Sequence, residues 1–416
     1  MTHVEEPGAA GGGRGHRIPV GVGVRRWFLR PPRRHGEIEV DRRVSFLELF
    51  YDLVYVVLIG QAAHSLAGDV SWRGGATFVV VFGMIWIAWL NGTLFYELHG
   101  REDGRTRSLV FLQMLVLSLM AVYVGHADGD DGRALASLYA VLLLILSWQW
   151  YSVYRHDPPE HRRTPRRYLL AMLGGVVVIA ASVPLSQDGR LAVWAAYVAA
   201  WCAVQFVVVA AWRARPSYDV VTDSMVERFG LFIIIVLGEV VVGVVDGLSE
   251  AERNPLVVTT GLISLCIGFG FWWTYADLVA RRLPGNARSS LAVWIFAHLP
   301  MTMAVAAAGA GMVGLIEHAE DSRTPSGVSW LLSTSVSVIL LTIGTVLTTL
   351  DEDRPRHPVH FPVRVALAGA AMVSLLLGWA RPAPWSLALT LLALFALTWG
   401  YAFTRRLRTG LLVNER

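Results

Sequence analysis

Long runs of apolar residues, separated by short charged or Gly/Pro-rich breaks, repeat along the chain from about residue 44 to residue 404. Each run is near the ~20 residues that a helix needs to cross a ~30 Å hydrocarbon core. Membrane-spanning strands would instead alternate apolar and polar positions. The pattern therefore predicts an all-α, polytopic membrane helix bundle of twelve transmembrane helices: 44–67, 76–98, 107–125, 133–154, 168–185, 191–212, 226–248, 256–279, 289–313, 327–350, 361–380 and 384–404.

The breaks divide the chain into four parts. Residues 1–43 are rich in Gly, Pro and Arg and too poor in apolar side chains to fold alone, so they are predicted to be a disordered basic tail. Residues 44–212 and 226–404 form two halves of six helices each, and 405–416 form a C-terminal tail. Because the last two runs meet across a very short turn, whether they make two full spans stays open.

The placement of the arginines tests the division into twelve spans and indicates on which side of the membrane each loop lies. Of the 36 basic residues, 28 lie in the two tails and in every second loop, and six lie singly in the loops between. The other two, Arg228 and Arg364, lie at span ends on the Arg-rich side. Because positive residues concentrate in cytoplasmic loops, this split predicts that both termini are cytoplasmic.

Composition excludes several classes of protein. With 54% hydrophobic and 16% charged residues, the chain is unlike ordinary soluble proteins, which carry roughly 25% charged residues. There is no Lys, so a Schiff-base cofactor and a phosphate-binding P-loop are both excluded. Cys202 and Cys266 lie in apolar runs and predict neither a disulfide nor a metal cage. We expect no cofactor, no metal and no nucleic-acid partner; the expected partners are membrane lipids and an unidentified small substrate or ion.

Charged residues inside a span cost about 2.5–3.5 kcal/mol each and therefore mark candidate sites. Glu48 and Asp52 lie one turn apart in the first span and share a helix face with Tyr55. Two neighbouring acids repel each other unless they share a proton or face an Arg. Glu48 could instead be solvated at the cytoplasmic boundary. Gln61 and His64 follow in the same span as secondary candidates.

The seventh span carries three more candidates. Glu227 and Arg228 stand at its cytoplasmic end, where a structural ion pair is the simple alternative to a functional role. Glu239 lies twelve residues further, about 18 Å along the helix and thus near mid-membrane. No charged residue neighbours it, so its partner must come from another helix. Glu239 is the strongest candidate for a binding or proton-relay group.

Two further candidates lie in the second half. His298 stands about 14 Å into the ninth span, two residues before Pro300, whose missing backbone hydrogen bond frees a carbonyl nearby. Its alternative is a core histidine with satisfied hydrogen bonds. Asp277, at the cytoplasmic end of the eighth span, is a secondary candidate; beside Arg281 and Arg282 it is equally well a solvated acid.

The two halves share a faint internal similarity. Placing Glu48 on Glu227 aligns Phe50 with Phe229 and Val57 with Val236. Both spans enter from the cytoplasmic side, six spans apart, so the halves are expected to be parallel repeats.

These motifs resemble a known family. The segments 48–54 (Glu-Leu-Phe-Tyr-Asp-Leu-Val), 227–232 (Glu-Arg-Phe-Gly-Leu-Phe) and 237–239 (Leu-Gly-Glu) are similar to the signatures of the bacterial low-temperature-requirement A (LtrA) membrane proteins. The segments 298–300 and 275–277 resemble its weaker motifs. The chain departs at Phe229, where the family often has His. The resemblance implies a multi-pass protein of the bacterial plasma (inner) membrane linked to growth at low temperature, and it names no reaction.

The favoured hypothesis is a transporter-like, proton-coupled protein in which Glu239, Asp52 and His298 form a midplane site between two halves. One rival is an intramembrane enzyme acting on a lipid or lipid-linked substrate, with Asp52 or Glu239 as base and His298 as acid. Another is a non-catalytic scaffold or sensor whose acids hold helices together.

Overall fold

The computed structural model describes residues 27–28, 31–34, 44–211, 222–252, 254–280, 282–285, 288–350 and 360–408. Over these residues the secondary structure is helical, and twelve helices are long and apolar enough to cross a membrane, as the apolar runs predicted. In the first half they are α2 (Phe46–Gly68), α3 (Trp72–His99), α4 (Gly104–Tyr123), α5 (Gly132–His156), α6 (Arg163–Ser182) and α7 (Gln187–Ala211). In the second half they are α8 (Asp223–Glu250), α9 (Pro255–Leu278), α10 (Arg288–Glu317), α11 (Ser326–Val346), α12 (His360–Ala380) and α13 (Pro384–Arg408).

Helix starts follow local sequence signals. Ser45, Ser71, Asp103, Thr222 and Asn254 each precede a helix and accept a hydrogen bond from a backbone N–H of its first turn. Such caps satisfy donors that have no partner within the helix. They explain why helices begin at these residues, close to where the apolar runs begin.

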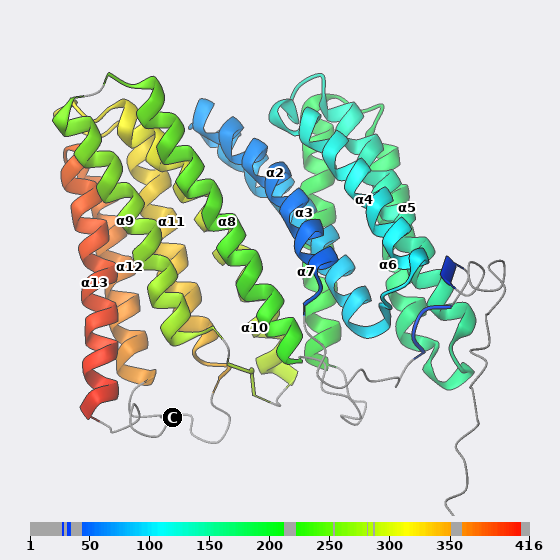
Figure 1. The fold of residues 1–416 in the computed structure, drawn as a ribbon. Coiled ribbons are helices and arrows are strands. Elements are labelled where there is room, and N and C mark those ends of the chain that lie inside the picture. Colours follow the sequence, from blue (N-terminus) through cyan, green and yellow to red (C-terminus); the bar gives the residue numbers. More distant parts are fainter. Residues whose placement is uncertain are drawn as a thin grey trace, which may run out of the picture.

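Helix packing in the first half recurs in the second. The pairs α2–α3, α2–α4, α3–α5, α3–α7, α4–α5, α5–α6 and α6–α7 all pack, and so do the pairs six helices later, from α8–α9 to α12–α13. Between the halves, α2 packs on α8, and α10 packs on α2, α3 and α7. Figure 1 shows α2 and α8 side by side at the front of the molecule, with the two halves on either side of them.

Close helix packing depends on small residues. A Cβ on Gly83 of α3 would lie 2.6 Å from Val198 Cγ1 of α7, so only glycine allows this approach. On α10, the stretch Ala304–Ala310 is almost wholly buried. The short side chains let α10 lie between the halves, as small residues do in membrane helix packing.

The predicted tails lie mostly outside the described residues. Residues 31–34 are described, and here Arg33 donates from its backbone to His99 O (3.0 Å) and from its guanidinium to Glu97 O (2.8 Å). This short part of the tail that was expected to be disordered is therefore docked on the C-terminal end of α3. At the other end of the chain, α13 continues through Arg408, four residues beyond the predicted span.

Candidate functional site

An Arg between two acids connects the halves of the molecule. Arg228 of α8 donates from Nη1 to Glu48 Oε1 (3.2 Å) and from Nη2 to Asp52 Oδ1 (3.0 Å), and its Nε lies 3.3 Å from Asp52 Oδ2. The predicted one-turn spacing of the two acids on α2 is what lets a single guanidinium reach both. We call Glu48, Asp52 and Arg228 the α2–α8 clamp.

Buried partners surround the clamp. Asp52 is 0% exposed and Arg228 2% exposed, and Trp89 of α3 donates its Nε1–H to Asp52 Oδ1 at 2.9 Å. Glu48 also closes a capping box with Ser45, whose backbone N–H donates to Glu48 Oε2 at 3.0 Å. Each carboxylate therefore has at least two donors, which is what a buried charge requires.

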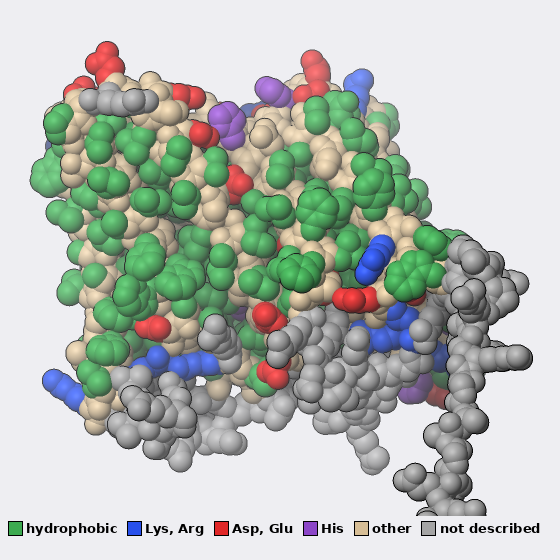
Figure 2. Space-filling view, viewed as in Figure 1, with side chains coloured by type: hydrophobic (Ala, Val, Ile, Leu, Met, Phe, Trp, Pro, Cys, Tyr) green, Lys and Arg blue, Asp and Glu red, His purple; other side chains and the backbone are tan. Residues whose placement is uncertain are grey.

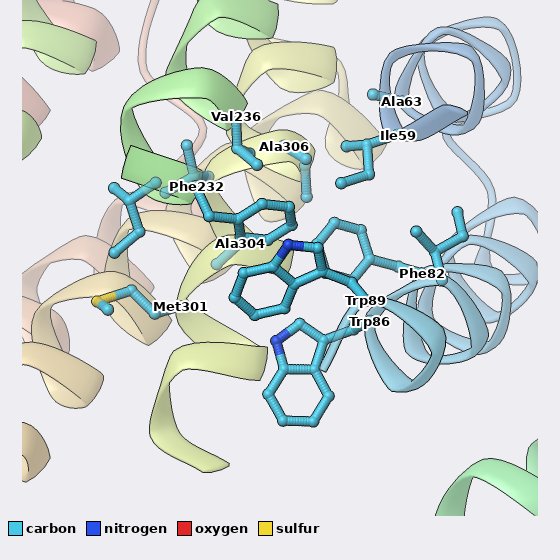
Figure 3. Close-up of a cluster of buried hydrophobic side chains, with 14 of the residues drawn as sticks. Ile59, Ala63, Phe82, Trp86, Trp89, Phe232, Val236, Met301, Ala304 and Ala306 are labelled. Carbon is cyan, nitrogen blue, oxygen red and sulfur yellow. The ribbon is translucent and has the colours of Figure 1, made fainter. Parts of the chain in front are cut away.

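Aromatic rings form the next layer of this contact. Trp89 stacks on Phe232 of α8 with ring centroids 4.0 Å apart, and meets Phe229 edge to face at 5.0 Å. Figure 3 shows Trp89 between Phe232 and Trp86, close to Ile59 of α2 and to Ala304 and Ala306 of α10. Because apolar side chains enclose the clamp here, its charges act in a medium of low dielectric constant.

Tyrosines and amides form a second buried network inside the first half. Tyr51 donates to Gln113 Oε1 of α4 at 2.5 Å and lies 3.2 Å from Tyr55 Oη. Gln149 of α5 donates to Tyr96 Oη at 3.1 Å. Tyr55, a secondary candidate from the sequence, thus belongs to a network that ties α2 to α4.

His298 lies in a separate aromatic pocket. Its Nδ1 is 2.6 Å from Trp294 O, and its Nε2 is 3.3 Å from Tyr275 Oη. A carbonyl only accepts, so Nδ1 carries a hydrogen; in the neutral ring Nε2 then accepts from Tyr275. His298 is fully buried and packs against Phe229, with ring centroids 5.1 Å apart. This geometry matches the alternative of a core histidine with satisfied hydrogen bonds.

Glu239 lies apart from both groups, at the seam between α2 and α8. It is eleven residues beyond Arg228, or about 16 Å along α8. Its carboxylate occupies the space where a side chain would stand on Gly60 of α2. Glu239 is only half-buried, and among the described residues its carboxylate has no hydrogen bond or ion pair.

The remaining candidates lie on the exposed face of α2 and near the Arg-rich ends of α8 and α9. Gln61 and His64 are exposed on α2, one and four residues beyond Gly60, and Glu227 is exposed near the start of α8. Asp277 accepts a hydrogen bond from Trp399 Nε1 of α13 at 2.6 Å, so it is anchored to a neighbouring helix rather than simply solvated. Arg281 lies outside the described residues.

The candidates therefore do not converge on one point. Asp52, His298 and Glu239 belong to the clamp, the aromatic pocket and the seam, respectively. Over the described part of the chain, no group of three or more His, Cys, Asp or Glu side chains is arranged to hold a metal ion. A largely apolar groove of about 370 Å³ lies between α6 and α7, and its walls carry no acid and no histidine.

Several polar members of these networks were not among the candidates from the sequence: Ser45, Tyr51, Trp89, Tyr96, Gln113 and Gln149. The two glutamines stand inside apolar runs, so the cost of burying an amide could have marked them. Trp89 gave a weaker signal, because its indole is largely apolar and only its Nε1–H needs a partner when it is buried.

Comparison with protein families gives a match over nearly the whole bundle. The model of the bacterial low temperature requirement A protein (LtrA) family matches residues 43–398. This range begins just before α2, includes every candidate residue above, and ends inside α13.

Two curated proteins are also similar in sequence. One is an uncharacterized protein of Rhizobium meliloti (strain 1021), 25% identical over 277 residues, which covers 62% of this chain and 66% of that protein. The other is a potassium channel of Streptomyces collinus, 24% identical over 160 residues, which covers 32% of this chain and 75% of the channel. Thus the chain spans about two thirds of the first relative's length and three quarters of the second's.

Proposed function

The chain belongs to the bacterial low temperature requirement A (LtrA) family of membrane proteins, and from that premise we propose that it moves a small monovalent cation across the membrane. The family name describes a growth requirement and not a reaction, so the choice of reaction rests on the arrangement of the polar side chains. In this proposal the cation passes along the seam of α2 and α8, and Glu239 contacts it.

The observation that carries the proposal is the unpaired carboxylate of Glu239. It lies about 24 Å from the first residue of α8, a helix about 42 Å long, and is thus far from both ends. An ionisable group at that depth must face protein or water, because facing lipid costs several kcal/mol. Among the described residues no Arg or His pairs with it, so a cation can serve as its counter-charge.

Two further observations support a cation over an anion or a lipid. Gln61, one residue beyond Gly60, supplies an amide oxygen on the exposed face of α2, and oxygen atoms are the ligands that hard cations prefer. One relative bears the name of a potassium channel. Potassium is therefore the first ion to test.

The clamp has a different role in this proposal. Asp52 is engaged by both Arg228 and Trp89, so it is not free to bind a passing ion. It holds α2 and α8 together and thereby fixes the seam. A single midplane site made of Asp52, His298 and Glu239 is less well supported, because these residues lie in three separate groups.

The rival functions have less support. An enzyme acting on a lipid needs a lateral opening beside its acid and base, and the groove between α6 and α7 has neither in its walls. A scaffold accounts for the clamp and for His298, but gives no reason for an unpaired acid at Glu239.

Ion flux from liposomes tests the proposal. Purified protein is reconstituted into vesicles loaded with K⁺, a protonophore is added, and a pH-sensitive dye reports the H⁺ influx that balances K⁺ efflux. We expect efflux above that of empty vesicles. Glu239→Gln keeps the side chain's size and removes its charge, and should lower the flux about tenfold, the change that ~1.4 kcal/mol in a barrier produces.

The matched control is Glu250→Gln, which removes an exposed carboxylate at the end of the same helix and should leave the flux unchanged. Parallel vesicles with Na⁺ gradients, and with H⁺ gradients and no protonophore, identify the ion. Wild-type vesicles that match empty ones under all three gradients would refute cation movement and leave the scaffold ahead.

A further inference from the structure

The interface between the two halves is asymmetric: α10 makes contacts across it that its counterpart in the first half does not make. α10 of the second half packs on α2, α3 and α7 of the first half. Helix for helix, the counterpart of α10 is α4, and the counterparts of α2, α3 and α7 are α8, α9 and α13. A two-fold relation between the halves would therefore pack α4 on α8, α9 and α13. Within the described residues α4 packs on α2 and α5 and makes no comparable contact with the second half.

Such an interface is head-to-tail, and it leaves a matching surface unused at each end. Repeated between like units, a head-to-tail interface generates a ring where the rotation closes and an open filament where it does not. In this chain the unused surfaces are α4 on the first half and α9 with α13 on the second half. A second copy presents the same two surfaces and can cover both.

The buried fractions of the counterpart helices agree with unused surfaces on α4 and α9. In its most apolar 18-residue stretch, α10 is 78% buried but α4 only 39%, and α3 is 94% buried but α9 only 33%. On both α4 and α9, large apolar side chains three or four residues apart form an exposed stripe along the helix. On α4 they are Phe111, Leu115, Leu119 and Val122, and on α9 they are Val258, Leu262, Phe269 and Trp273, with Cys266 among them.

Lipid alone could cover apolar stripes, but it does not suit the front of α2 and α8. Here α2 exposes Gln61 and His64, and Glu239 of α8 is half-exposed beside Gly60. Figure 2, viewed as in Figure 1, shows acidic and His side chains in the upper middle of this face, where it is hollowed between the halves. A carboxylate at the depth of Glu239 faces protein or a water-filled cavity.

We propose that the chain consists of two parallel repeats packed head-to-tail and that a second copy of the chain completes the assembly. In the resulting dimer, α4 of each copy packs on α9 and α13 of the other copy, as α10 packs on α3 and α7 within one copy. The four halves form a ring, and the fronts of α2 and α8 from both copies face its axis.

The contact of α10 with α3 and α7 indicates which residues of α4 and α9 would meet between two copies. Phe296 of α10 packs against Trp86 of α3, with ring centroids 5.8 Å apart, and against Trp201 and Phe206 of α7 at 6.5 and 5.8 Å. Aligning the Arg-Ser pairs that begin the third and ninth predicted spans puts Leu115 of α4 in the place of Phe296. Aligning the ends of α3 and α9 puts Leu265, next to Cys266, in the place of Trp86.

This assembly does not depend on the proposed function, because a protein that moves no ion can still form it. Only one consequence rests on cation movement: the path along the α2–α8 seam would then be enclosed by the two copies together. Crosslinking reports the assembly without any flux, so the failure of one proposal is distinguishable from the failure of the other.

Disulfide crosslinking in membranes tests the dimer. Cys202→Ala leaves Cys266 as the single thiol on the α9 stripe, and Leu115→Cys adds one on α4; Phe111→Cys and Leu119→Cys test the adjacent turns. With copper phenanthroline as oxidant, we expect at least one of these pairs to give a band at twice the chain mass of 45.7 kDa. Each thiol alone should give several-fold less.

Two control variants place the second thiol on other exposed faces. The controls are Val177→Cys on α6 and Met372→Cys on α12. Val177 is 68% exposed and Met372 60% exposed, so random collisions would crosslink cysteines at these positions with Cys266 as readily as a cysteine on α4. They should give no more dimer than Cys266 alone. Native mass spectrometry of the unmodified protein should also give twice the chain mass. A monomer mass, or equal crosslinking through α6 and α12, would overturn the proposal.

Discussion

At the scale of single residues, the clamp contains one more negative group than positive groups. Arg228 supplies one positive charge between two carboxylates, and Trp89 and Ser45 supply the neutral donors that complete the shell. Removing one partner of a buried ion pair leaves an uncompensated charge, which is more costly than never having buried the pair. The clamp residues should therefore depend strongly on one another.

Arg228→Met should destabilise the protein by about 3–5 kcal/mol, because the buried Asp52 loses its counter-ion and Glu48 loses one of its partners. The expected result is a loss of folded protein, measured by size-exclusion chromatography of a fluorescent fusion from solubilised membranes. Adding Glu48→Gln and Asp52→Asn removes the two charges that Arg228 contacts and should restore much of the signal. As a control, Arg408→Met changes an exposed Arg at the end of α13 and should have little effect. If the triple variant is no better than Arg228→Met, charge compensation is not what makes Arg228 necessary.

Glu239 differs from the clamp acids at this same scale, since its carboxylate lacks a partner among the described residues. Its neutralisation should change ion flux and not folding, whereas neutralising Arg228 should change folding. The two variants thus distinguish the acid proposed to contact the cation from the charge that joins α2 and α8.

At the scale of helices, small residues determine how closely two helices can approach. The first six helices are held together by Gly83 against Val198, and by buried hydrogen bonds such as that from Tyr51 to Gln113. Because lipid is as apolar as the helix surfaces, packing geometry decides which helices meet.

Gly83→Val should therefore separate α3 from α7. Its side chain would meet Val198, and overpacking of this kind typically costs 1–3 kcal/mol. The thermal midpoint of the solubilised protein is expected to fall, and Val198→Ala in the same chain should recover part of the loss by making room. Gly174→Val on α6 is the control, because no atom lies within 4 Å of its added Cβ. A drop of equal size in the control would point to helix propensity rather than to contact with α7.

At the scale of the whole molecule, twelve spans return the chain to the side on which it began. From the Arg distribution we expect that side to be the cytoplasm. Orientation and assembly are separate questions: the first is decided by loop charges, and the second by which helix faces remain uncovered.

Reporter fusions check the orientation. A reporter that is active only in the cytoplasm should work at residue 416, and a reporter that is active only outside should work between α8 and α9, near residue 252. A reversed pair of signals would overturn the assignment from Arg, while two signals on the same side would overturn the span count.

The sequence by itself determined the membrane class, the number and limits of the spans, and the spacing of Glu48 and Asp52 on one face. These follow from local quantities: apolar length against membrane thickness, cap residues, and the helical period. The recurring Glu-containing motifs also sufficed to indicate the family.

Only the tertiary structure decided which partner each polar group has. The Glu227–Arg228 sequence suggested a local ion pair, yet Arg228 reaches across to α2, because side chains adjacent on a helix do not face each other. Trp89, which the sequence did not single out, donates a hydrogen bond to Asp52. Asp52, His298 and Glu239 were expected to form one site but lie in three separate groups in the fold. The sequence fixes how far along its helix each residue lies, whereas its neighbours depend on how the helices rotate and pack against one another.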